Sequence, residues 1–139
     1  MKEVTKEYLK DLVYNVIGAA IEVHKELGAG LLESVYHECL KKELSLRDIS
    51  FRSEMPIIVH YKGFELETKF RCDLFVENIL PVELKAVKEI PSIDEAQLLT
   101  YMKLLGAPEG LMINFMVKNI FKEGQKTYVN ELYYELPES

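Results

Sequence analysis

The first part of the chain carries apolar residues at the three- and four-residue spacing of an amphipathic helix. The stripe follows Thr5, a residue type that caps helix N-termini, and it stops at Gly28. A second stripe begins beyond Gly30 and continues to about Leu46. The buried positions expected in the two stripes are Leu9, Leu12, Val13, Val16, Ile17 and Ala20, then Leu32, Val35, Tyr36, Cys39 and Leu40. The pattern therefore predicts two helices joined by a tight, glycine-containing corner.

Alternating and continuous apolar runs then replace the helical spacing and predict three strands. These strands are expected at about residues 51–61, 65–76 and 80–87. Lys62-Gly63 should turn the first pair and Glu77-Asn78-Ile79 the second. Pro81 lacks an N–H, so a β-bulge or a late start is expected in the third strand.

The remaining chain predicts one more helix and further strands. Ser92-x-x-Glu95 is a capping-box signature after Pro91, and Gly106 marks the end of this helix. A core strand is expected from Leu111 to Val117, followed by a hairpin through 122–124 to Tyr128 and Val129. The fold class indicated is α/β, with a mixed central sheet flanked by helices and the order of two helices, three strands, a helix and three strands.

Composition agrees with a single globular domain over residues 1–139, since 48% of the residues are hydrophobic and 29% are charged. No apolar run approaches the roughly 20 residues of a membrane span, and the charged start lacks the core of a signal peptide. A cytoplasmic location is expected. The two cysteines, Cys39 and Cys72, fall on apolar faces, which indicates core thiols rather than a disulfide or zinc site.

Two of the predicted strands carry charges on one face, because residues two apart on a strand point the same way. Asp73 lies on the polar face of residues 65–76, while Glu83 and Lys85 share the polar face of the next strand. With a loop at 77–79, Asp73 faces Glu83 and Arg71 faces Lys85.

Two adjacent carboxylates repel by roughly 4 kcal/mol at about 4 Å and an effective dielectric near 20, so such a pair usually needs a cation. Mg²⁺ or Mn²⁺ suits these hard oxygen ligands and leaves positions for water and a substrate phosphate. Lys85 could then orient or deprotonate a water or stabilise developing negative charge. The alternative interpretation is a salt-bridged polar surface.

Several motifs in order give the chain a family resemblance. They are Ala20-Ile21-Glu22-Val23-His24, Leu27-Gly28-Ala29-Gly30, Gly30-x-x-Glu33-x-x-Tyr36, Tyr61-Lys62-Gly63, Arg71-Cys72-Asp73, Glu83-Leu84-Lys85, Gln97, Tyr101 and Ile113-Asn114-Phe115. With them the chain resembles the GxxExxY proteins, a branch of the PD-(D/E)xK nuclease superfamily, over nearly its whole length. The resemblance implies a restriction-endonuclease-like core.

The resemblance also implies roles for individual residues. Catalysis would use Asp73, Glu83, Lys85 and Glu33, and the metal shell would comprise Asp73, Glu83, Glu33 and Leu84. Substrate contacts would come from Gln97, Tyr101 and Arg71. From the residues alone, Glu33 also fits an acid favoured by the helix dipole, and Gln97 with Tyr101 also fits a solvated glutamine over a half-buried tyrosine.

The function expected is a Mg²⁺- or Mn²⁺-dependent nuclease, with DNA a better candidate than RNA, no membrane partner, and a homodimer left open. A net charge of −6 is unfavourable for nucleic-acid binding, although Lys and Arg residues around a cleft would offset it. The alternative is a nucleic-acid-binding or protein-interaction module with little or no activity on the same fold.

Overall fold

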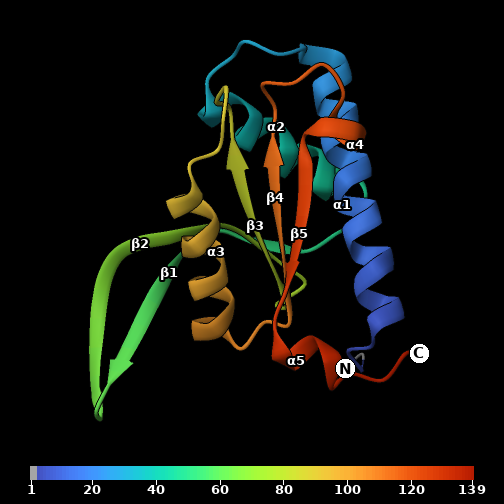
Figure 1. The fold of residues 1–139 in the computed structure, drawn as a ribbon. Coiled ribbons are helices and arrows are strands. Elements are labelled where there is room, and N and C mark those ends of the chain that lie inside the picture. Colours follow the sequence, from blue (N-terminus) through green and yellow to red (C-terminus); the bar gives the residue numbers. More distant parts are fainter. Residues whose placement is uncertain (1–2) are drawn as a thin grey trace.

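The computed structural model describes residues 3–139 and begins with the two predicted helices (Figure 1). Helix α1 spans Lys6–Leu27 and α2 spans Glu33–Leu46. Thr5 caps α1 as expected, because its Oγ1 accepts the Tyr8 N–H at 2.9 Å. Gly28, with φ +73°, ends α1 in a backbone conformation that other residues rarely adopt.

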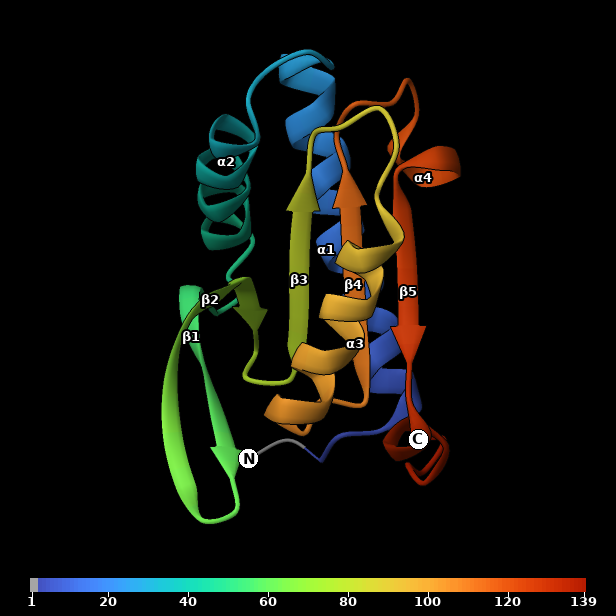
Figure 2. The same cartoon turned by 60° about the vertical axis from the view of Figure 1, so that its left-hand side comes forward.

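Five strands form one mixed sheet in the order β1-β2-β3-β4-β5. Their bounds are β1 Phe51–Tyr61, β2 Phe64–Val76, β3 Leu80–Lys85, β4 Glu109–Asn114 and β5 Gln125–Val129. Strands β3 and β4 are parallel and all other neighbours are antiparallel. Helix α3 (Ser92–Leu105) covers one face of the sheet and α1 covers the other (Figures 1 and 2). The predicted α/β class, with a mixed sheet between helices, is confirmed.

The side-chain alternation of the central strands separates two apolar layers. Toward α1 and α2, the sheet contributes Leu74, Val76, Leu80, Val82, Leu84, Leu111 and Ile113. Toward α3, Met112 packs with Leu98, Met102 and Ala107, while Phe75 and Cys72 pack with Tyr101. Residues on β3 with the opposite parity, Glu83 and Lys85, therefore face the α3 side.

Strands β1 and β2 leave the sheet as a long hairpin, and residues 56–71 are here named the hairpin arm (Figure 1). Pairing of β2 with β3 ends at Leu74 opposite Val82. Apolar side chains on the arm remain exposed, among them Phe64 at 69% and Phe70 at 52%. Strand β1 forms an edge of the sheet, and Glu54 within it has a positive φ of 50°.

Two details of the predicted strands are wrong. Pro81 causes neither a bulge nor a late start, since β3 begins at Leu80 and Pro81 lies opposite Phe75 without a register shift. Pairing with β4 begins only at Val82, so the missing N–H of Pro81 interrupts no bond on that side. The fourth strand spans Glu109–Asn114, so it begins two residues before and ends three residues before the expected bounds.

The end of the chain also differs from the expected order. Within residues 3–139, two strands follow α3 instead of three, because residues 120–123 form the short helix α4 between β4 and β5. The Asn119 side chain caps α4 by accepting the Lys122 N–H at 2.9 Å. A second short helix, α5 (Glu131–Tyr134), follows β5.

The capping box predicted for α3 is also not formed. Ser92 is already the first helical residue, and Pro91 occupies the cap position without a side-chain bond. Glu95 instead accepts hydrogen bonds from Lys126 Nζ at 2.8 Å and from the Tyr128 hydroxyl on β5. The Glu95 side chain therefore joins α3 to the sheet edge.

Two compositional expectations can be compared with the structure. No helix within residues 3–139 has the length and apolar character needed to cross a bilayer. Cys72 is fully buried, as expected for a core cysteine, whereas Cys39 is half-buried and packs against the core from α2.

Candidate active site

Asp73 and Glu83 meet at the point where β2 separates from β3. The Asp73 N–H donates to Glu83 Oε2 at 2.8 Å, and the Leu84 N–H donates to Asp73 Oδ2 at 2.8 Å. Each carboxylate thus takes a backbone N–H of the other strand, in the place of a ladder hydrogen bond. The predicted approach of these two acids is confirmed.

The two carboxylates are largely removed from solvent, and neither forms an ion pair with a described lysine or arginine. Glu83 is 6% exposed, and burial, followed by the charge of Asp73, raises the pKa of Glu83 to about 8. Burial also raises the pKa of Asp73, and the charge of Glu54 on β1 adds to this effect. Among residues 3–139, no lysine or arginine forms an ion pair with either acid.

Lys85 lies at the end of β3, on the same face as Glu83. Its positive charge lowers the pKa of Asp73 and Glu83 against the larger effect of burial, so it is electrostatically coupled to both acids. Its ion pair is instead with Asp94 in the first turn of α3, where Lys85 Nζ lies 3.6 Å from Asp94 Oδ2. Sequence reasoning missed Asp94, because nothing local to the helix indicates that it meets β3.

Arg71 does not face Lys85 as predicted. Strand β2 pairs with β3 only from Leu74 onward. Arg71 lies before this point, where β2 pairs with β1 alone, and its partner there is Pro56. Its guanidinium donates to the backbone oxygens of Thr68 and Phe70, each at 3.0 Å. Arg71 is exposed on the hairpin arm, where its role in substrate binding stays a prediction.

Helix α2 brings Glu33 and His37 toward the acid pair. Burial and the negative charge of Asp73 raise the pKa of Glu33, the first residue of the helix. His37 lies one turn later, with Nε2 3.0 Å from Ser53 Oγ, and its charge lowers the pKa of both Asp73 and Glu33. No ligand spacing along the chain singles out His37, but its position four residues after Glu33 was a signal for a shared helix face.

Tyr101 from α3 closes the opposite side of the site. It is 3% exposed, and burial, with the charges of Glu83, Cys72 and Asp73, raises the pKa of Tyr101 to about 12. Its ring makes an edge contact with Phe70 of the arm at a centroid distance of 6.3 Å. Gln97 lies one turn earlier and is half-buried, but no described contact joins it to the acids. Tyr101 is therefore more deeply buried than the half-buried tyrosine of the alternative interpretation.

Tyr36, the tyrosine of the G-x-x-E-x-x-Y motif, has a structural place. It is fully buried and stacks on Phe115 at 4.4 Å with an interplanar angle of 7°. Its hydroxyl donates to the Gly28 carbonyl at 2.6 Å and accepts the Leu31 N–H at 3.1 Å. These bonds fix the corner between α1 and α2, and so the position of Glu33.

The donor set fits a hard divalent cation. One oxygen of each carboxylate is used by a backbone N–H, which leaves Asp73 Oδ1 and Glu83 Oε1 as possible ligands. Mg²⁺ and Mn²⁺ are often held by one or two carboxylates, with water and phosphate completing the shell. Within residues 3–139 no three His, Cys, Asp or Glu side chains are already gathered around one point, so Glu33 and the Leu84 backbone stay predicted ligands.

A mixed sheet between helices, with an aspartate, a glutamate and a lysine on its central strands, is consistent with the restriction-endonuclease-like fold. A profile of the PD-(D/E)XK nuclease superfamily matches residues 10–127, and the chain belongs to this superfamily. Searches of curated proteins and of solved structures gave no significant match. Membership of the GxxExxY branch stays a prediction.

The raised pKa of Glu83 predicts a pH-dependent stability in the absence of metal. Between its ordinary value of 4.5 and about 8, the native state keeps a proton that the unfolded chain has lost. The free energy of unfolding should therefore fall as the pH rises through this range, by at most about 1.4 kcal/mol per pH unit for one proton. Urea unfolding of the chelator-treated protein across the range measures this slope.

The matched variant is Glu83→Gln, which has no proton to lose and should flatten the profile. Mn²⁺ should stabilise the wild type most at the upper end of the range, because it competes with the proton. A metal-free profile that is flat or rises in this range would contradict the assignment of a protonated Glu83.

Proposed function

We propose that this protein is a Mg²⁺- or Mn²⁺-dependent nuclease that hydrolyses phosphodiester bonds, with DNA as the favoured substrate. One observation carries the proposal: Asp73 and Glu83 lie side by side, and each carboxylate accepts a hydrogen bond from a backbone N–H of the other residue's strand. Both acids are largely buried, and neither has an ion-pair partner among the described residues. Such a pair is costly unless a cation compensates it. The superfamily membership supports nucleic acid as the substrate class.

A bound divalent ion would polarise the phosphate and lower the pKa of a coordinated water. Asp73 and Glu83 would hold that ion, with Glu33 approaching from α2. Lys85 would orient the attacking water or stabilise negative charge on the phosphate, and Asp94 keeps its ammonium group at the end of β3. Tyr101 would exclude water on the α3 side, since it is itself buried.

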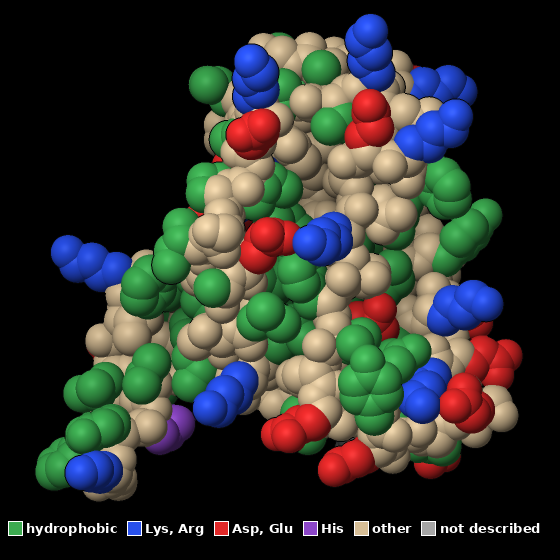
Figure 3. Space-filling view, in the orientation of Figure 1, with side chains coloured by type: hydrophobic (Ala, Val, Ile, Leu, Met, Phe, Trp, Pro, Cys, Tyr) green, Lys and Arg blue, Asp and Glu red, His purple; other side chains and the backbone are tan. Residues whose placement is uncertain are grey.

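The hairpin arm is the favoured place for the nucleic acid to lie. It carries three basic residues, Lys62, Lys69 and Arg71, and only two acids. The arm is therefore net positive, whereas the whole chain has a net charge of −6. Figure 3 shows the arm projecting from the body, with hydrophobic side chains along this face and basic side chains at its tip and margin. Arg71 on β2, with Gln97 and Tyr101 on α3, stay the predicted substrate contacts. Of these, Tyr101 is close enough to the acid pair for the charges of Glu83 and Asp73 to raise its pKa.

Replacement of Lys85 by alanine should reduce cleavage by roughly 10²–10⁴-fold, the usual contribution of a positioned proton-transfer group. The measurement is cleavage of end-labelled single- and double-stranded DNA and RNA in Mg²⁺ and Mn²⁺. Lys122→Ala is the matched control, because Lys122 is an exposed lysine on α4 and its side chain makes no described contact.

Equal product from wild type and Lys85→Ala would assign the activity to another site or to a contaminant. The RNA and DNA arms of the same panel identify the substrate. Retention of Mn²⁺ binding with no product from any substrate would contradict catalysis by the isolated chain.

The second candidate function is a binding module that keeps the fold without cleavage. The observation that favours it is the ion pair of Lys85 with Asp94, which already compensates the charge of the proposed catalytic lysine. Such a module should bind nucleic acid equally well in the wild type and in Lys85→Ala, without a metal-dependent product. Light scattering of the same samples tests the homodimer, which stays a prediction.

A further inference from the structure

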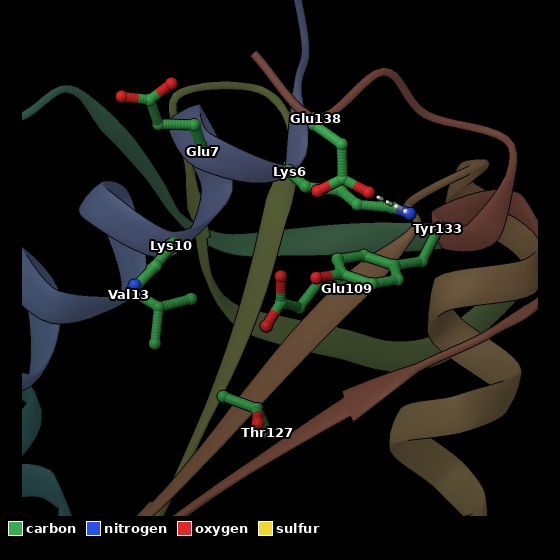
Figure 4. A pocket seen from close by; sticks show the side chains of 8 residues that line it. All are labelled: Lys6, Glu7, Lys10, Val13, Glu109, Thr127, Tyr133 and Glu138. Atoms are coloured by element: carbon green, nitrogen blue, oxygen red, sulfur yellow. Dashed lines mark hydrogen bonds and ion pairs between the residues drawn. The ribbon is translucent and has the colours of Figure 1, made fainter.

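A pocket of about 560 Å³ lies on the α1 side of the sheet. It is formed by segments far apart in the sequence, namely the first turns of α1, the start of β4, β5, α5 and the end of the chain (Figure 4). Its lining residues are Lys6, Glu7, Lys10, Val13, Glu109, Thr127, Tyr133 and Glu138. A volume of this size is within the range of small-molecule sites.

Glu109 is the unusual residue of this pocket. It begins β4 with the same parity as Leu111 and Ile113, which pack against α1, so an apolar residue would be expected there. It is 8% exposed, and no side chain or backbone group within residues 3–139 forms a hydrogen bond or ion pair with its carboxylate. Burial alone raises the pKa of Glu109. No fully buried side-chain oxygen of the described residues lacks a partner, so the Glu109 carboxylate must open into the pocket. A charged carboxylate in so enclosed a place is costly unless a cation pairs with it.

The nearby lysines do not serve as that partner. Lys6 Nζ is paired with Glu138 Oε1 at 3.1 Å and lies 5.4 Å from the centroid of the Tyr133 ring. Lys10 lines the pocket from α1 but forms no ion pair with Glu109. Figure 4 shows the Glu109 carboxylate inside the pocket, with the Tyr133 side chain reaching in from α5.

The walls of the pocket are held in place by the end of the chain. The Lys6 N–H donates to the Pro137 carbonyl and the Glu7 N–H to the Glu138 carbonyl, each at 2.9 Å. These bonds satisfy helix N–H groups that α1 itself cannot pair. The pocket is therefore a built feature of the fold, and it is separate from the acid pair, since Glu83 faces α3 while Glu109 faces α1.

We propose that this pocket binds a ligand through a primary ammonium or guanidinium group, which pairs with Glu109 between Thr127 and the ring of Tyr133. A cation is the matching charge, because the pocket holds three acids and two lysines, and the Lys6–Glu138 pair leaves two acids against one lysine. An aromatic ring beside the carboxylate adds a favourable contact for an organic cation. The group can belong to a free amine or to a lysine or arginine side chain of a polypeptide.

Nuclear magnetic resonance titration of the whole chain tests the proposal. The probes are butylammonium, butylguanidinium, acetyl-lysine amide and acetyl-arginine amide, with butyrate as the anionic control. We expect saturable shifts of the Glu109, Thr127 and Tyr133 amides with the cationic probes and none with butyrate. Tighter binding of the capped amino acids would indicate a polypeptide source, and tighter binding of the butyl compounds would indicate a free amine.

Variants assign the binding to Glu109. Glu109→Gln should weaken the best probe at least tenfold, whereas Glu26→Gln, an exposed acid on α1 outside the pocket, should leave it unchanged. Lys10→Ala should keep the melting temperature and retain or strengthen binding. The absence of saturable shifts in the wild type, or equal affinity in Glu109→Gln, would overturn the proposal. The wild-type titration decides even where a variant does not fold.

Discussion

Asp73→Asn is expected to abolish measurable Mn²⁺ binding and DNA cleavage while the protein remains folded. The asparagine oxygen can still accept the Leu84 N–H that Asp73 Oδ2 accepts in the wild type. The charge that would hold the cation is lost, so one of the two proposed carboxylate ligands is removed without a change of shape. Calorimetric titration with Mn²⁺ measures the binding, and urea unfolding measures the stability.

Asp73→Ala is the informative comparison. It removes the same charge but leaves the buried Leu84 N–H without its acceptor, which should cost about 1–3 kcal/mol of unfolding free energy. The two variants therefore separate the role in metal binding from the role in joining β2 to β3. Unchanged Mn²⁺ affinity in Asp73→Asn would refute the proposed metal site.

Tyr36→Ala should destabilise the protein by about 3–5 kcal/mol, the range for loss of a large buried aromatic side chain. It removes the stack on Phe115 and both hydroxyl bonds that hold the corner between α1 and α2. Tyr36→Phe keeps the ring and should cost about 1–3 kcal/mol, because the Gly28 carbonyl and the Leu31 N–H lose their partner. Urea unfolding measures both values.

The matched control is Tyr14→Ala on α1, since Tyr14 is 71% exposed. Its unfolding free energy should stay within about 0.5 kcal/mol of the wild type. If Tyr36→Ala were as mild as Tyr14→Ala, the tyrosine of the signature motif would have to act at the site rather than in the core.

The elements were predictable because their signals are local. The apolar stripes with Thr5 and Gly28 gave α1, and the period-two alternation with its turn residues gave β1, β2 and β3 close to their observed bounds. The short loop at 77–79 also placed Asp73 opposite Glu83, because the register of a hairpin follows from its loop. The acid pair was therefore predictable from the sequence alone.

Other parts of the site depend on long-range packing, which no local pattern contains. Arg71 was misplaced because β2 diverges from β3 immediately before Leu74, which follows from how the arm leaves the sheet rather than from the strand pattern. Asp94 and His37 reach the site only because α3 and α2 pack beside β3. Glu109 lies before the strand that was expected from Leu111, and only its burial on the α1 side of the sheet distinguishes it.

The open edge of β1 has a consequence for the behaviour of the protein at high concentration. A long edge strand with exposed apolar side chains can pair with the edge of another molecule and begin aggregation. In β1, Pro56 offers no N–H to an incoming strand, and the positive φ of Glu54 breaks the regular run of backbone donors and acceptors. These two interruptions limit pairing at the open edge while the surface of the arm stays uncovered, which favours colloidal stability.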